Sequence, residues 1–376
     1  MIIFLTGSKV SGAPGVEALT KRILAARLHL GSEHRLFEDS PARGFSRPDY
    51  ATIIPDYLSY LVGKIARWRG CRADKINYEH IGALCDTFDI EYGTARNAAL
   101  APFWTAAAKK FAPSIHTDGD AHEKFAELNA ITLLWIRHVV RRELTLQRGW
   151  SDAATEFLRR MPVTRQPWAT VTLNHDLILE DAFSRLNIPI ETGFGSTPEV
   201  AAFNPTSIRN PQAPLLLKLH GSINWFLDRD RQEILREGVA EPDSLPRSAP
   251  FGPEINVGTF NKLEAYSSEI YPFLFAAFDR VLSQARAIII SGYGFMDDGV
   301  SSRIFNELRY RPSLRILVIH PKPDELIALA TPFARHHFAR LKNLNQITWV
   351  GCKFEEVVQP PFVGDVLDPF VAEHSA

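Results

Sequence analysis

The stretch IIFLTGSKVSGAPG, residues 2–15, decides the fold. Its first part, Ile2–Thr6, is rich in apolar β-forming residues and therefore predicts a buried strand. Glycine, serine and proline interrupt the apolar run, and apolar residues return at helical spacing over Val16–Leu30. A strand, a glycine-rich turn and a helix open a nucleotide-binding α/β domain, because the turn lets backbone N–H groups approach a phosphate at the helix N-terminus. Any strand-to-helix turn favours these residue types, so a purely structural turn stays an equal alternative for this motif alone.

Apolar runs of strand length recur in the second half of the chain. They cover Trp168–Leu173, Leu215–Leu219, Ala287–Ile290, Leu314–Ile319 and Gln346–Val350. Helical patterns lie between several of them, over Leu177–Leu186, Leu263–Ala285, Val300–Leu308 and Asp324–Leu329. Continuously apolar strands that alternate with helices predict a parallel sheet covered on both faces. We therefore expect an α/β fold built on a Rossmann-like parallel sheet.

Helical patterns dominate the region between the first strand and the second. The clearest runs over His122–Gln147, where large apolar side chains and His138 fall close to one stripe. We expect residues 1–40 and 163–376 to form the nucleotide-binding domain and residues 41–162 to form a large helical insertion.

The composition is that of an ordinary globular protein with a sizeable core. Of the 376 residues, 45% are hydrophobic and 23% are charged, and the net charge is −1, so the charge does not indicate nucleic-acid binding. The N-terminal apolar run is too short for a signal peptide or a membrane span, so we expect a cytoplasmic protein. The cysteines are far apart and offer neither a zinc site nor a disulfide framework, and we expect no metal: Cys71, Cys85 and Cys352.

Polar residues follow three of the predicted strands, where a parallel sheet presents groups to a ligand. TLNHD, Thr172–Asp176, closes one strand, and His220 follows another within LLLKLHGSINW. IIISGYGFMDD, Ile288–Asp298, closes a third with a second glycine turn. Each motif has a structural alternative, because Asn or Asp residues also cap helices and a lone histidine is more often structural than catalytic.

Taken in order, these motifs resemble the sirtuin family, and more closely its bacterial sirtuin-like branch associated with NAD hydrolysis in antiphage defence. The strings that carry the resemblance are GSKVS with GAP, then TLNHD, KLHGSINW and GYGF. The resemblance covers roughly residues 1–30 and 165–325. The chain departs from the family pattern at Lys9, where a glycine is usual, and at His175, where the bacterial branch often has tyrosine. Lys9 either pairs with a phosphate or crowds it.

The resemblance implies cleavage of the nicotinamide–ribose bond of NAD, which would be the substrate. Asn174 would orient the ribose and the attacking water, and Asp176 would lie close to the nicotinamide. His220 would act as general base, a role that suits an ordinary histidine pKa near 6.5. The residues expected to contact NAD are Gly7, Ser8, Lys9, Ser11, Thr172, Ser291, Gly292 and Asp297. A deacetylase is disfavoured, because that branch carries four zinc-binding cysteines.

Two other classes of function stay open. The first is a catalytically weak sensor that binds NAD or an NAD derivative, and the second is a scaffold subunit of an ATPase, helicase or nuclease partner. The insertion spans more than a hundred residues, and its charged and apolar helix over His122–Gln147 predicts self-association or docking of a partner. We expect a homo-oligomer, no membrane association, and a contact that controls access to NAD.

Overall fold

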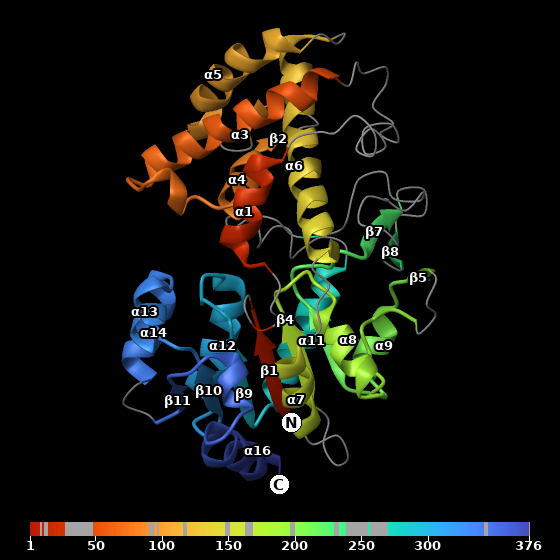
Figure 1. The fold of residues 1–376 in the computed structure, drawn as a ribbon, viewed down its shortest axis with the longest axis vertical. Coiled ribbons are helices and arrows are strands. Elements are labelled where there is room, and N and C mark those ends of the chain that lie inside the picture. Colours follow the sequence, from red (N-terminus) through yellow and green to blue (C-terminus); the bar gives the residue numbers. More distant parts are fainter. Residues whose placement is uncertain are drawn as a thin grey trace. The chain divides into compact units, whose positions relative to one another are not determined.

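The structure is a computed structural model in which the chain forms two compact units (Figure 1). It describes residues 1–7, 10, 14–26, 48–89, 94–95, 98–115, 119–146, 151–161, 168–195, 200–228, 233–237, 255, 270–341 and 345–375. The sheet unit comprises Met1–Ala13, Gln147–Ser222 and Ala265–Ala376, and the helical unit comprises Pro14–Leu146 and Ile223–Glu264.

A six-stranded parallel sheet forms the centre of the sheet unit (Figure 1). Its strands are β1 (Ile2–Thr6), β4 (Ala169–Thr172), β6 (Leu215–Lys218), β9 (Ala287–Ser291), β10 (Arg315–Ile319) and β11 (Ile347–Val350). They lie in the order β11-β10-β9-β1-β4-β6, and every neighbouring pair is parallel. The predicted α/β fold with a parallel sheet is confirmed, and each of the six strands lies within a residue or two of its predicted position.

The strand order places a topological switch point beside β1. From β1 the chain builds one side of the sheet through β4 and β6, and then returns to build the other side through β9, β10 and β11. This is the order of a doubly wound nucleotide-binding sheet, in which the connections leave β1 and β9 in opposite directions. Ligands of such sheets bind outside the carboxyl ends of the strands at that point.

Helices surround the sheet (Figure 1). Among the described residues of this unit they are α7 (Asp152–Arg160), α8 (Ile178–Arg185), α9 (Pro205–Arg209), α11 (Tyr271–Gln284), α12 (Asp298–Tyr310), α13 (Pro323–Leu329), α14 (Pro332–Leu341), α15 (Phe354–Val357) and α16 (Asp368–Ser375), and the short strand β5 spans Val200–Ala202. Alternate strand residues such as Ile2 and Phe4 pack on α7 and α15 in one apolar cluster. The ring of Phe4 lies 4.1 Å from that of Phe157 and 5.7 Å from that of Phe354.

The helical unit is a bundle around the long helix α6. Its described elements are α1 (Val16–Ala25), α3 (Pro48–Trp68), α4 (Tyr78–Cys85), α5 (Ala101–Phe111), α6 (Ala121–Leu146), the strands β2 (Phe88–Asp89), β3 (Thr94–Ala95), β7 (Trp225–Asp228) and β8 (Glu233–Glu237), and short 3₁₀ turns at Ala73–Lys75, Ala98–Leu100 and Ala112–Ser114. Helices α1, α3, α4 and α5 all contact α6. The buried hydroxyl of Tyr57 in α3 donates to Oδ1 of Asn129 in α6 at 2.7 Å. In the part of the chain that is described, no helix is both long and apolar enough to cross a membrane.

The helical unit differs from the expected insertion in three respects: it also contains β7 and β8, it lacks α7, and it includes α1. Helix α1, expected within the nucleotide-binding domain, belongs to the helical unit and contacts α6 and α4. The two compact units are defined only by which residues pack together. The predicted domains, residues 1–40 with 163–376 and residues 41–162, therefore stay a prediction.

The apolar stripe of α6 is buried inside its own unit. Phe125, Ile131, Trp135 and Val139 are all less than a tenth exposed. These side chains are not available for self-association, and the expected oligomer therefore stays a prediction without this support.

Candidate active site

The carboxyl ends of β1, β4 and β9 lie side by side at the switch point. The strand register pairs Thr6 with both Thr172 and Ser291, and all three residues are buried. The hydroxyl of Thr6 donates to Oγ1 of Thr172 at 2.9 Å. These strand ends therefore present hydroxyl groups and the following backbone in one place.

Gly7 and Gly292 allow the turns after β1 and β9 to approach each other. The N–H of Gly7 donates to the carbonyl oxygen of Ser291 at 3.0 Å. A Cβ atom at Gly7 would lie 2.4 Å from the carbonyl oxygen of Gly292, which no side chain tolerates. Gly292 itself has a φ of +67°, in the region that favours glycine. Both glycines are thus required by the backbone, independently of any contact with a ligand.

Asn174 ties the loop after β4 to the turn after β1. Its backbone N–H donates to Oγ1 of Thr172 at 3.1 Å, and its side-chain Nδ2 donates to the carbonyl oxygen of Gly7 at 3.0 Å. The amide group is half-buried and held at the switch point. This is the position that the sequence predicts for a group that orients a ligand.

Asp176 supports the first turn of α8. Its Oδ1 accepts from the N–H of Ile178, the first residue of α8, at 3.1 Å, whereas the N-cap position itself is Leu177, which makes no side-chain cap. Its carbonyl oxygen accepts from the ammonium group of Lys218, and Lys218 also pairs with Glu180 at 2.8 Å. Asp176 therefore has a structural role at the start of α8.

His220 forms a buried pair with Asp297. The two side chains are 5% and 6% exposed, and Nε2 of His220 lies 2.8 Å from Oδ2 of Asp297. The pair joins the loop after β6 to the turn after β9, which are 77 residues apart in sequence. The ring of His175, which follows Asn174, has its centroid 6.4 Å from that of His220. The loops after β4 and β6 therefore bring these two rings near each other.

Tyr293 holds the backbone of Asp297. Its hydroxyl donates to the carbonyl oxygen of Asp297 at 2.9 Å and lies 2.7 Å from Oγ of Ser301. Burial, followed by the nearby charge of Asp297, raises the pKa of Tyr293 well above its ordinary value, so this phenol stays neutral and available as a donor. Sequence reasoning missed Thr6 and Tyr293, although both stand beside glycines at the ends of predicted strands.

The structure describes most of the residues of the predicted site and leaves three of them outside its described ranges. The structure brings Gly7, Thr172, Asn174 and Ser291 together by hydrogen bonds or register, and Gly292 lies against Gly7. It also joins His220 to Asp297. Ser8, Lys9 and Ser11 lie outside the described residues. Within the described ranges, no group of three or more His, Cys, Asp or Glu side chains is placed to hold a metal ion.

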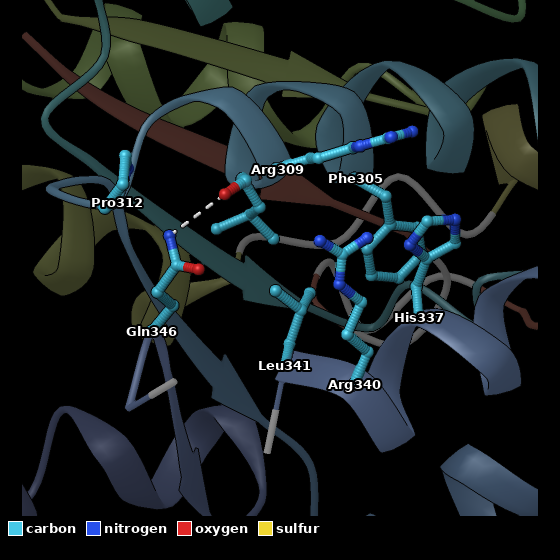
Figure 2. A pocket seen from close by; sticks show the side chains of 8 residues that line it. Phe305, Arg309, Pro312, His337, Arg340, Leu341 and Gln346 are labelled. Atoms are coloured by element: carbon cyan, nitrogen blue, oxygen red, sulfur yellow. Dashed lines mark hydrogen bonds between the residues drawn. The ribbon is translucent and has the colours of Figure 1, made fainter. Parts of the chain in front are cut away.

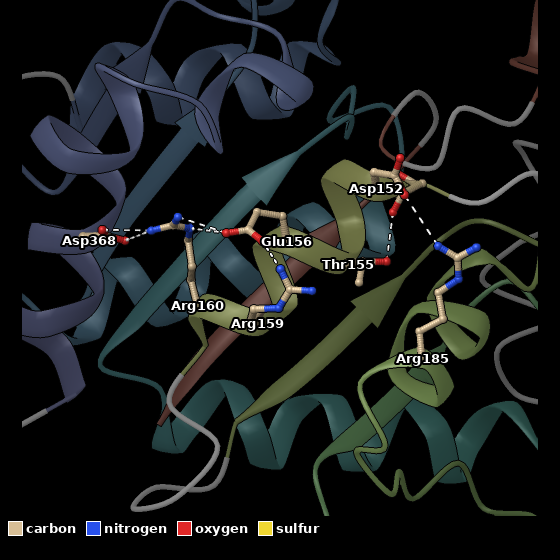
Figure 3. A network of polar contacts seen from close by, with 8 residues as sticks. Asp152, Thr155, Glu156, Arg159, Arg160, Arg185 and Asp368 are labelled. Atoms are coloured by element: carbon tan, nitrogen blue, oxygen red, sulfur yellow. Dashed lines mark hydrogen bonds and ion pairs between the residues drawn. The ribbon is translucent and has the colours of Figure 1, made fainter.

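Two cavities lie elsewhere in the sheet unit. One of about 120 Å³ lies between α12 and α14, beside Pro312 and Gln346, which precede β10 and β11 (Figure 2). It is therefore at the amino ends of the strands, opposite the switch point. A second, of about 1100 Å³, lies along α7. Figure 3 shows the polar side chains of this helix with their partners. The arginines of this cavity are held in ion pairs: Arg160 with Glu156 and Asp368, Arg159 with Glu156, and Arg185 with Asp152. Neither cavity contains a residue of the predicted site.

One protein-family model matches part of the chain. Residues 169–348 match the family model described as the SIR2-like domain. This match supports a sirtuin-like family. The matched SIR2-like region runs from the start of β4 into β11, and so it contains Thr172, Asn174, His220, Ser291 and Asp297.

Several solved structures are similar to the chain. One is a Sir2 homologue in complex with NAD, with a TM-score of 0.41, 15% identity, and coverage of 100% of this chain and 90% of that chain. A mutant Sir2 homologue with ADP-ribose has a TM-score of 0.40 and 14% identity, over 99% of this chain and 92% of that chain. A mutant with 2′-O-acetyl ADP-ribose has a TM-score of 0.37 and 17% identity, over 69% and 79%. No curated protein matches the sequence.

Proposed function

We propose that this chain is an NAD glycohydrolase, which uses water to cleave the bond between nicotinamide and ribose. The match of residues 169–348 to the SIR2-like domain supports the substrate class. The observation that carries the proposal is the polar edge of the sheet at the switch point. Asn174 is bonded to the turn after β1, and the buried pair of His220 and Asp297 lies at the ends of β6 and β9.

The reaction moves ribose C1′ from the nicotinamide nitrogen to a water oxygen. It releases nicotinamide, ADP-ribose and one proton, and it passes through a state in which the sugar ring carries positive charge. We assign to His220 the removal of a proton from water or a ribose hydroxyl. Asn174 would orient the ribose and the attacking water, and Asp176 would lie close to the nicotinamide.

The remaining predicted contacts are assigned to the rest of NAD. Ser8, Lys9 and Ser11, with the backbone at Gly7, would hold the pyrophosphate, since a glycine turn before a helix presents N–H groups to anions. Thr172, Ser291, Gly292 and Asp297 would line the remainder of the crevice. The zinc module of the deacetylases plays no part in this proposal.

Incubation of the purified chain with NAD, with nicotinamide and ADP-ribose separated by chromatography, is the direct test. His220→Ala should slow the release of nicotinamide by about 10²–10⁴-fold, the usual contribution of a general base. Asn174→Ala should reduce it strongly as well. The matched controls are His336→Ala and Asn306→Ala, which replace exposed residues of α14 and α12 and should keep the parental rate.

Calorimetric titration with NAD separates the competing functions. Binding of NAD without release of nicotinamide would replace the hydrolase with the sensor class. Absence of both binding and cleavage would refute the proposal, and a parental rate in either His220→Ala or Asn174→Ala would refute the role of that residue.

We further propose that the activity serves antiphage defence in the cytoplasm. An unregulated hydrolase would deplete the NAD of its own cell, so we propose control by self-association or by an ATPase or helicase partner. Phage plating on bacteria that express the wild-type chain or His220→Ala tests the role. Equal plaque numbers on both strains would argue against it.

A further inference from the structure

The carboxylate of Asp297 makes more contacts than a helix cap requires. Its Oδ1 accepts from the N–H of Val300 at 3.0 Å, which caps α12, and its Oδ2 lies 2.8 Å from Nε2 of His220. A cap needs one oxygen, and Asn, Ser or Thr would supply it as well. The second contact, to a histidine in the loop after β6, is therefore not explained by capping.

We infer that Asp297 is a positioning residue that fixes His220 in the tautomer with its proton on Nε2. An ionised carboxylate only accepts hydrogen bonds, so the nitrogen that faces it must carry a proton. The lone pair of the neutral ring is then on Nδ1, which becomes the basic nitrogen. This assignment deepens the proposed function, because it names the atom of His220 that would accept the proton during NAD cleavage.

The surroundings keep Asp297 in place for this role. The N-terminus of α12 favours a negative charge at its cap, and so stabilises the ionised form of the carboxylate. The hydroxyl of Tyr293 donates to the carbonyl oxygen of Asp297 and also lies within hydrogen-bond distance of Oγ of Ser301. Both members of the pair are buried, where a charged hydrogen bond is stronger than in water.

The substitution Asp297→Asn tests the assignment without removing the cap. Its Oδ1 still accepts from Val300, so its Nδ2 faces His220 as a donor and requires an unprotonated Nε2. The proton of the ring should then move to Nδ1, and the basic nitrogen should point away from its former position. Asp297→Ser keeps a cap but removes the partner of His220, and Asp298→Asn is the matched control, because Asp298 is the exposed next residue.

The readout is the nitrogen spectrum of histidine-labelled full-length protein at pH 8.5, with His220 assigned from the spectrum of His220→Gln. We expect protonated Nε2 in the wild type and in Asp298→Asn, and protonated Nδ1 in Asp297→Asn. In the same variants, kcat for nicotinamide release should fall about 10²–10⁴-fold for Asp297→Asn, with KM changed by only a few-fold.

Two results would overturn the inference: a wild-type His220 protonated on Nδ1, or an Asp297→Asn protein with the wild-type tautomer and rate. A wild-type chain that releases no nicotinamide refutes the proposed function instead. The tautomer measurement does not depend on that activity and still decides whether Asp297 orients the ring.

Discussion

The buried His138 should make the stability of the helical unit depend on pH. Its side chain in α6 is 2% exposed, and neither ring nitrogen has a hydrogen-bond partner among the described residues. Burial, followed by the positive charges of Arg141 and Arg142, lowers the pKa of His138 to about 3. The folded protein therefore keeps this ring neutral under mildly acidic conditions.

The sign and size of this change in stability follow from the pKa that His138 has in the unfolded chain. There the same ring has a pKa near 6.5, so between pH 6.5 and 3 the unfolded chain binds a proton that the folded protein does not. Acid therefore favours unfolding: the contribution to stability is complete above pH 6.5 and is lost progressively as the pH falls towards 3. At pH 5 the loss relative to pH 7.5 is about 2 kcal/mol of the free energy of unfolding, since each pKa unit corresponds to about 1.4 kcal/mol.

Urea denaturation followed by circular dichroism at pH 7.5 and pH 5 measures this loss. His138→Leu removes the titrating ring and leaves no unbonded polar atom, so it should lose about 2 kcal/mol less than the wild type between the two pH values. His122→Leu, at an exposed position of the same helix, should behave as the wild type. Should His138→Leu fail to fold, His138→Gln serves instead. The same pH dependence in the wild type and in the folded variant would refute the argument.

Two further predictions concern the sheet unit. Gly7→Ala should cost about 1–3 kcal/mol in urea denaturation, because its Cβ would lie 2.4 Å from a carbonyl oxygen, and it should weaken NAD binding in calorimetry. Its control is Gly63→Ala in α3, where a Cβ atom would meet nothing within 4 Å. Because alanine has a higher helix propensity than glycine, this control should keep or raise the free energy of unfolding. Equal losses of stability in both variants would contradict the close approach at Gly7. Phe4→Ala should cost about 3–5 kcal/mol, because it removes a ring packed on Phe157 and Phe354, and a loss below about 1 kcal/mol would mean that this cluster is loosely packed.

The sequence predicted that the candidate residues follow the ends of strands, but it did not predict the hydrogen bonds between them. Polar residues that follow apolar runs are visible in the sequence, and this pattern located Asn174, His220 and Asp297. It assigned Asp297 to the cofactor or to a helix cap, whereas the structure bonds it to His220 as well. That partnership has no local signal, because the two residues are 77 positions apart and each also has a common structural explanation.

The sequence by itself determined the strands, because a strand of a covered parallel sheet is mostly apolar and can be recognised from a few adjacent residues. It also determined that His138 lies on the apolar stripe of α6, since helical spacing is a local property. The tertiary structure alone decided the strand order, the switch point beside β1, and the burial of the α6 stripe against α1 and its neighbours. These features depend on which distant segments pack together. Apolar surfaces attract one another without direction, so they do not specify their partners in the sequence.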